Sequence, residues 1–146
     1  MKLGTSSYGG SDVKKTAIVH SNDSENPKVT LTIAGKVEKF VDLEPKYVRL
    51  TGRSGTQISI PVSIVPTTKY PFKIIDVTAR GASKGGNFIK YTLSERKPDT
   101  GNGYTLLIEN TKNEKGRYMD LITLTTDSQI QKKITIRVYG NILEPK

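Results

Sequence analysis

The chain carries few residues that could support catalysis, and their surroundings argue against it. His20 is the only histidine, and cysteine is absent. A serine–histidine–acid triad needs a histidine that accepts a hydroxyl proton and is oriented by a carboxylate, whereas His20 stands beside a run of turn-forming residues. We therefore interpret His20 as a solvated residue at the end of a strand. One histidine without cysteine also excludes a multi-histidine or thiolate zinc site.

Acidic residues are present, but they form no catalytic or metal-binding pattern. Glycoside hydrolysis needs two carboxyl groups about 5–10 Å apart in a cleft, and the spacing of Glu95, Asp99, Glu109 and Asp120 pairs none of them. Residues 21–27 (SNDSENP) lack the central glycine and terminal glutamate of a calcium-binding EF-hand loop. Asn and Asp side chains that bond their own backbone explain this loop as a turn. The sequence therefore predicts a protein that is not an enzyme, with no metal site and no cofactor.

Basic side chains are the remaining candidates for a binding site. Residues 80–87 (RGASKGGN) are rich in glycine, but they lack the order Gly-x4-Gly-Lys-Ser/Thr of a phosphate-binding loop, and no helix pattern follows them. We interpret the segment as an ordinary loop. The alternative is an anion-contact site in the loops, formed by Arg80, Lys84, Arg96 and Lys97.

The net charge is +9, from 23 basic and 14 acidic residues. Such a charge suits a polyanion partner, for example nucleic acid, anionic lipid or acidic glycan, but the basic residues are scattered, which favours a solvated surface. Single-stranded nucleic acid binding needs aromatic rings among basic residues on one sheet face. Tyr91 and Tyr104 alternate with polar residues, which places them with the core, so a nucleic acid partner is disfavoured.

Length and hydropathy fix the broad class. A chain of 146 residues can build one domain with a sizeable core. No apolar run approaches the ~20 residues that span a bilayer, so we expect no membrane insertion. No signal-peptide pattern opens the chain.

Alternation of apolar and polar residues, the period of a β-strand, recurs along the chain. It is clearest from Ile58 to Ile64, where Pro61 predicts a strand that lies partly at a sheet edge. Residues 38–43 are expected to be a linker, and no segment has the periodicity of a helix. We predict an all-β protein with about nine short strands in a β-sandwich of two antiparallel sheets.

One strand pair occurs twice. A shift of 105 positions aligns residues 15–37 with residues 120–142 without a gap, and it superimposes Gly35 on Gly140. Alternating apolar residues fall on one another in the second strand of each pair. A glycine at the same place in both predicts a β-bulge or a close backbone approach.

Two segments resemble a known family. Residues 43–79 resemble the opening of bacterial Ig-like domains related to the major sperm protein and ASH group. Pro45 matches the proline of the first strand, Gly55 the glycine turn, residues 58–64 the long strand, and residues 71–74 the proline segment that follows it. Residues 8–37 resemble the closing hairpin of a bacterial domain of unknown function that occurs in exported proteins. Its pattern SNDPxNPxVTLxIxGxV is met at Ser21, Asn22, Asp23, Asn26, Pro27, Val29, Thr30, Leu31, Ile33, Gly35 and Val37. Ser24 departs from it, and the second copy has Gln131 and Lys132 in place of the asparagine and proline.

The resemblance implies an Ig-like fold, tandem copies and a periplasmic or cell-surface location. Residues 39–146 are then a complete Ig-like domain, and residues 1–38 are the closing hairpin of an upstream repeat, or else extra strands of the main sheet. The expected function is a structural or protein-interaction module of a larger exported bacterial protein, whose partners are another protein or adjacent Ig-like domains. The alternative is a domain that binds an anionic glycan or other polyanion through basic loops.

Overall fold

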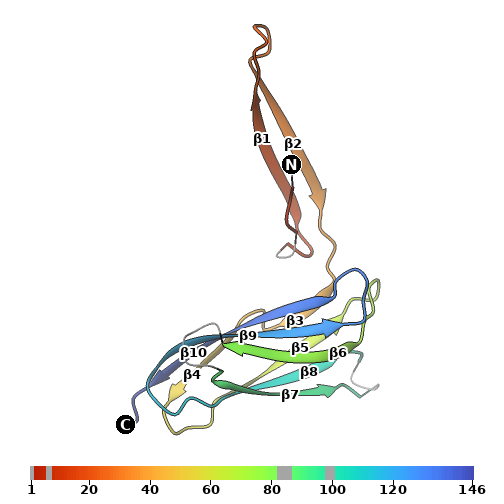
Figure 1. Ribbon diagram of the computed structural model, residues 1–146. Coiled ribbons are helices and arrows are strands. Elements are labelled where there is room, and N and C mark those ends of the chain that lie inside the picture. Colours follow the sequence, from red (N-terminus) through yellow and green to blue (C-terminus); the bar gives the residue numbers. More distant parts are fainter. Residues whose placement is uncertain (1, 6–7, 82–86, 98–100) are drawn as a thin grey trace. The chain divides into compact units, whose positions relative to one another are not determined.

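The computed structural model describes residues 2–5, 8–81, 87–97 and 101–146. The chain forms two compact units, Met1–Phe40 and Val41–Lys146. Within the described residues, all regular structure is β-strand (Figure 1). The expected all-β class is confirmed.

The first unit is a β-hairpin. Strands β1 (Asp12–His20) and β2 (Lys28–Lys36) pair antiparallel and form a two-stranded sheet of their own. Residues opposite each other in an antiparallel pair point to the same side of the sheet. One side of this hairpin is therefore mostly apolar, and it carries Val13, Lys15, Ala17, Val19, Val29, Leu31, Ile33 and Gly35.

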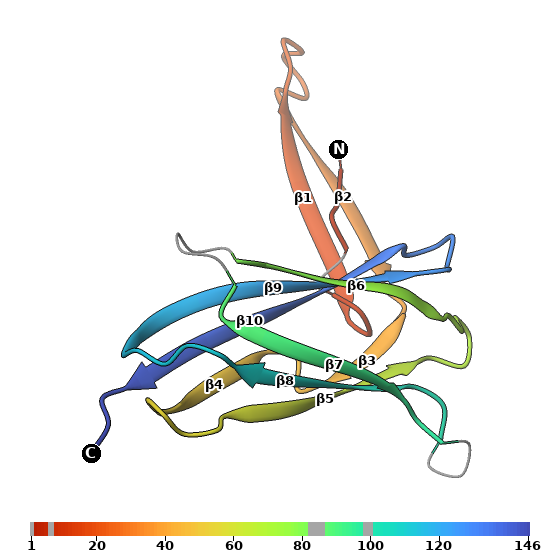
Figure 2. The same cartoon turned by 60° about the horizontal axis from the view of Figure 1, so that its bottom comes forward.

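The second unit is a sandwich of two four-stranded sheets, with orders β4-β10-β9-β6 and β3-β5-β8-β7. Its strands are β3 (Val41–Glu44), β4 (Val48–Arg53), β5 (Ser59–Pro66), β6 (Ile74–Gly81), β7 (Ile89–Glu95), β8 (Tyr104–Asn110), β9 (Gly116–Thr126) and β10 (Lys133–Leu143). Figure 2 shows the two layers, with β9, β10 and β6 in one and β8, β5 and β7 in the other. The predicted β-sandwich is confirmed.

One pairing differs from the expected purely antiparallel sheets. Strand β10 turns back antiparallel along β9, but on its other side it runs parallel to β4, with Val138 opposite Val48. The sheet that contains β10 is therefore mixed, and the sheet that contains β5 is antiparallel throughout. Parallel neighbours need a long crossover connection, and the chain between β4 and β10, residues 54–132, is long enough to supply it.

The core lies between the two sheets. Alternate residues of β9 and β10 are buried and the others are partly or fully exposed, as the period of two requires. Each fully buried Leu, Ile or Val side chain stabilises the fold by about 1.5–3 kcal/mol through removal from water. The fully buried aliphatic residues of the sandwich come from both sheets: Val48, Leu50, Val62, Ile64, Leu106, Ile108, Ile122, Leu124, Ile136, Val138 and Ile142.

The strand pairing tests three local predictions. Residues 41–43, expected to be part of a linker, belong to the edge strand β3. Because β3 covers β5 only from Ser63 to Pro66, the side of Pro61 that lacks an N–H faces no partner strand, as predicted. Neither Gly35 nor Gly140 forms a bulge, since the register is continuous there, whereas β6 has an irregularity between Ile74 and Asp76.

Candidate functional site

The structure separates the basic residues that were expected to form one anion-contact site. Arg80 lies near the end of β6 and Arg96 directly follows β7. Strand β7 starts close to where β6 ends, and its seven residues span roughly 23 Å. Arg80 and Arg96 therefore stand at opposite ends of the sandwich, and Lys84 lies outside the described residues.

Arg96 is held by the sandwich. Its backbone N–H donates to the carbonyl oxygen of Gly103 at 2.9 Å, and its guanidinium donates to the hydroxyl of Ser63. The neighbouring Lys97 also has an interaction partner. A loop site that combines Arg80 with Arg96 and Lys97 is not assembled by this fold, so anion binding by these residues stays a prediction.

His20 is exposed at the end of β1. Among the described residues, no group of three or more histidine, cysteine or carboxylate side chains could hold a metal ion. The described part of the chain also contains no helix with the length and hydropathy needed to cross a bilayer.

Asp120 is a buried acid that sequence reasoning treated as one candidate among several. Its side chain is fully buried, and its Oδ2 accepts the N–H of Phe88 at 2.8 Å. Its Oδ1 has no hydrogen-bond partner among the described residues. Burial raises the pKa of the Asp120 carboxyl above its ordinary value of 3.8, although the Phe88 hydrogen bond opposes this change.

Tyr118 lies on the same face of β9 as Asp120. Its hydroxyl donates to Oδ1 of Asn110 at 2.8 Å, and its ring centroid is 5.3 Å from that of Phe88. Burial, and to a smaller extent the charge of Asp120, raises the pKa of Tyr118 to about 12. We interpret the cluster as structural, because it joins β9 to Asn110 of β8 and to Phe88, the residue that precedes β7.

The glycine shared by both strand pairs is explained by the same cluster. A Cβ added to Gly140 would lie 1.9 Å from Cε1 of Tyr118, because the ring packs directly over the Gly140 backbone. Around Gly35, which faces Val13, an added Cβ would meet nothing within 4 Å. The expected close approach is therefore found at Gly140, where a ring rather than a backbone is the neighbour.

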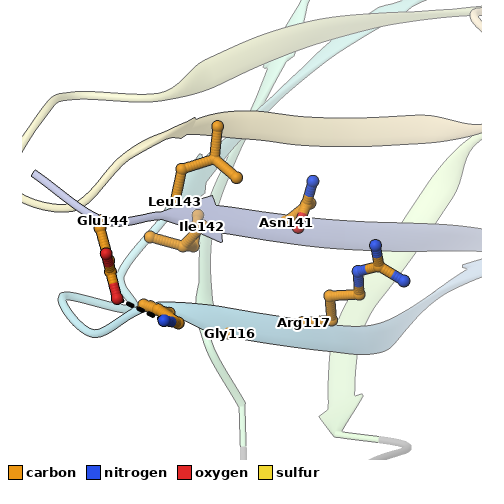
Figure 3. Close-up of a pocket in the computed structure, with 7 residues that line it drawn as sticks. Gly116, Arg117, Asn141, Ile142, Leu143 and Glu144 are labelled. Atoms are coloured by element: carbon orange, nitrogen blue, oxygen red, sulfur yellow. Dashed lines mark hydrogen bonds and ion pairs between the residues drawn. The ribbon is translucent and has the colours of Figure 1, made fainter.

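Two surface hollows lie on the described part of the chain. The first has a volume of about 370 Å³ and lies where β9 begins and β10 ends (Figure 3). Arg117 of β9 and Asn141 of β10 lie side by side in this hollow. The ammonium of Lys115 forms an ion pair with Glu144. The second hollow, of about 460 Å³, adjoins Gly35 on the hairpin.

The two strand pairs have the same register. In the hairpin Val19 lies opposite Val29, and in the sandwich the shifted pair is Leu124 opposite Ile134. The 105-position shift carries every hairpin pair onto a pair of β9 and β10. The repeat read from the sequence is therefore also a repeat in backbone pairing.

The loops that join the strands share their hydrogen bonds as well. The Ser21 hydroxyl donates to the Asn26 carbonyl at 2.6 Å, and the Thr126 hydroxyl donates to the Gln131 carbonyl at 2.6 Å. The N–H of Ser21 bonds the Pro27 carbonyl, and the shifted pair repeats this bond. These bonds keep the same loop shape although the asparagine–proline of the first loop is absent from the second.

The two pairs differ in what covers their apolar side. Ile134, Ile136 and Val138 are buried against the opposite sheet, whereas Val29, Leu31 and Ile33, at the shifted positions, are 39–49% exposed. The outer edges of the two pairs differ too. Strands β9 and β10 each pair with a further strand, whereas within the described residues β1 and β2 pair only with each other. The uncovered side of the hairpin is the candidate interaction surface of the first unit.

Comparison with solved structures gives matches of low similarity. Among solved structures, the ASH/PapD-like domain of human CEP192 (PapD-like domain 7) is 11% identical, with a TM-score of 0.46 over 73% of this chain and 87% of that one. A three-domain structure of mouse clustered PcdhgC3 (EC1-3) is 9% identical, with a TM-score of 0.45, and the chain spans 47% of its length. No family model and no curated protein matches the sequence.

Proposed function

We propose that this chain is a non-catalytic structural or protein-interaction module of a larger exported bacterial protein. We also propose that residues 1–38 are the closing hairpin of a preceding Ig-like domain. The single observation that carries the proposal is the shared register of the two strand pairs, one covered and one uncovered. The exported location follows from the resemblance of residues 8–37.

Physical chemistry supports a missing partner for the hairpin. A two-stranded hairpin alone is marginally stable in water, and large apolar patches on a surface mark interaction sites. Its opposite side is polar apart from Ile18 and Ala34, with Lys14, Thr16, Lys28 and Thr30 among its residues. This division is the pattern of a sheet that packs on one side only.

The sandwich indicates how the partner would pair. Strand β6 lies antiparallel beside residues 120–126 of β9, and β4 lies parallel beside residues 138–143 of β10. The same shift assigns an antiparallel strand to residues 15–21 and a parallel strand to residues 33–38. Asp127, whose Oδ1 accepts the N–H of Lys73 at 2.7 Å, corresponds to Asn22, which is expected to make the equivalent bond to the incoming strand.

Hydrogen exchange followed by mass spectrometry tests this proposal on the natural full-length protein and on the 146-residue chain. In the longer protein we expect the amides of β1 and β2 to exchange at least about a hundredfold more slowly, because strands on both edges protect them. The amides of β9 and β10 serve as the internal control and should not change. Equal exchange of the hairpin in both proteins, or a reading frame without a preceding Ig-like domain, would overturn the assignment of residues 1–38.

A further inference from the structure

The arginines of the chain are concentrated on one surface. Five of the six lie on strands β4, β6, β9 and β10 at exposed positions, namely Arg49, Arg53, Arg80, Arg117 and Arg137. Each arginine alternates along its strand with core-facing neighbours, so all five lie on the outer face of the same sheet. We call this surface the arginine face. The lysines, by contrast, are spread over both units of the chain.

Strand pairing fixes how the guanidinium groups are spaced. Arg80 lies opposite Leu121, and Leu121 lies opposite Arg137, so the two arginines are two strands apart, or about 10 Å. Arg49 lies opposite Tyr139 on the next outward-facing position of β10. Arg117 lies opposite Asn141, one further position along. The cations therefore form a staggered row across all four strands, with spacings that suit successive anionic groups of a polymer.

The arginine face contains little negative charge. Among the outward-facing positions of the four strands, Asp76 is the only acid, and Lys133 adds a sixth cation. Within the described residues, none of the five guanidinium groups is joined to a carboxylate by an ion pair. Like charges held on one rigid sheet repel each other, and an anionic partner would remove this repulsion.

We propose that the arginine face binds an acidic polysaccharide through its sulfate or carboxylate groups. The planar guanidinium donates two parallel hydrogen bonds to such a group, which the ammonium of lysine does not. The use of arginine here, in a chain rich in lysine, therefore points to oxyanion recognition rather than to general solubility. This inference goes beyond the interaction-module proposal, and it places anion contact on a sheet face instead of in the loops.

The remaining side chains of this face favour a polysaccharide over a protein or a nucleic acid. Between the cations lie hydroxyl and amide groups that can bond sugar hydroxyls, at Thr51, Thr78, Thr123, Thr125, Thr135 and Asn141. Arginine is common in protein interfaces too, but the cores of these interfaces are otherwise depleted of charge and rich in aromatic residues, whereas this face carries six cations. Surfaces for single-stranded nucleic acid stack successive bases on several rings. Tyr139, 37% exposed, is the one ring among the outward-facing residues of these four strands, because Tyr118 faces the core.

Heparin, a sulfated polysaccharide, is a suitable probe for the whole 146-residue chain. We compare a variant with Arg49→Gln, Arg117→Gln and Arg137→Gln against a control with Lys28→Gln, Lys36→Gln and Lys90→Gln. All six positions are exposed, and both variants lose three charges. We expect the arginine variant to bind heparin at least about tenfold more weakly, and the lysine control to change by less than about threefold.

A third variant replaces the same arginines by lysine and so keeps the charge. It should bind several-fold more weakly than the parent chain, since lysine cannot make the paired hydrogen bonds; thermal unfolding confirms that each variant is folded. An equal loss in the arginine and lysine-control variants would overturn the proposal, because net charge alone would then explain binding. Tighter, arginine-dependent binding of single-stranded DNA or of polyglutamate than of heparin would overturn it in favour of those partners.

Discussion

Asp120 keeps a carboxyl group in the interior of the sandwich with one oxygen bonded to Phe88 and the other without a partner among the described residues. Because its pKa is raised above 3.8 in the folded chain, folding favours the protonated form. The stability that this proton contributes is present below pH 3.8 and is lost as the pH rises through the folded pKa.

We therefore predict that Asp120→Asn changes stability in a pH-dependent way. The free energy of unfolding of the variant, relative to that of the parent chain, should increase as the pH rises from about 3.5 to neutrality, because the amide cannot ionise. Urea unfolding at a series of pH values measures this difference. A difference that stays constant or falls with pH would show that ionisation of Asp120 does not destabilise the fold.

Gly140 and Gly35 offer a matched pair of substitutions. Gly140→Ala forces a methyl group into the ring of Tyr118, which is fixed by Phe88 and by Asn110, and should cost about 1–3 kcal/mol of unfolding free energy. Gly35→Ala meets open space, so it should change stability by less than about 0.5 kcal/mol. Chemical denaturation of both variants checks this, and similar values for the two would contradict the packing described.

At this scale the sequence was informative only where two copies could be compared. The repeat singled out Gly140, but the ring that packs on it comes from Tyr118, whose counterpart Val13 gave no hint of such a contact. The burial of Asp120 could not be foreseen either, since the shifted position carries Lys15. The contact of Tyr118 with Gly140 depends on the register of β9 and β10. The burial of Asp120 depends on which strands face each other across the sandwich, and strand periodicity contains neither kind of information.

Strands β2 and β10 give a second matched pair, because Leu31 and Ile136 occupy the same position in the two copies. Ile136→Ala should lower the free energy of unfolding by about 2–5 kcal/mol, since the side chain is buried in the core. Leu31→Ala should cost less than about 1 kcal/mol in the 146-residue chain, where Leu31 is 49% exposed.

Thermal and urea unfolding followed by circular dichroism measures both substitutions. In the natural full-length protein, the proposed upstream domain would bury Leu31 and raise the cost of its substitution. A large cost already in the 146-residue chain would contradict the uncovered hairpin surface.

Most strands could be predicted from alternation, because each buries one face. Strand β3 was missed, since four residues with two partly buried side chains give little periodic signal. The parallel pairing of β10 with β4 was missed for another reason. The paired segments, residues 48–53 and 138–143, are far apart in sequence. Neither sequence indicates whether its neighbour runs parallel or antiparallel.

The two compact units lead to a prediction for the whole molecule. A chain of residues 39–146 should unfold cooperatively, with a midpoint within about 3 °C of that of the full 146 residues, because both sheets of the sandwich lie within it. Calorimetry of the two chains makes the comparison. A large drop in the midpoint would show that the hairpin contributes to the stability of the second unit.

The architecture of the second unit followed from the sequence, but its surface did not. The prediction of an anion-contact site in the loops was based on composition alone. The fold places Arg80 and Arg96 at opposite ends of the sandwich. The arginine face could be recognised only after register was known. Arg49, Arg117 and Arg137 lie on three strands, and only the pairing of β4, β10 and β9 brings them together.

The first and last strands of the second unit differ in length and in how many strands they pair with, and this difference has a mechanical consequence. Its first strand, β3, has four residues and pairs with β5 alone, whereas its last strand, β10, has eleven residues and lies between β4 and β9. A tether pulled at both ends would therefore peel β3 away at low force. Extraction of β10 requires ladders on both of its sides to shear together, so the remaining strands would stay intact as a load-bearing body.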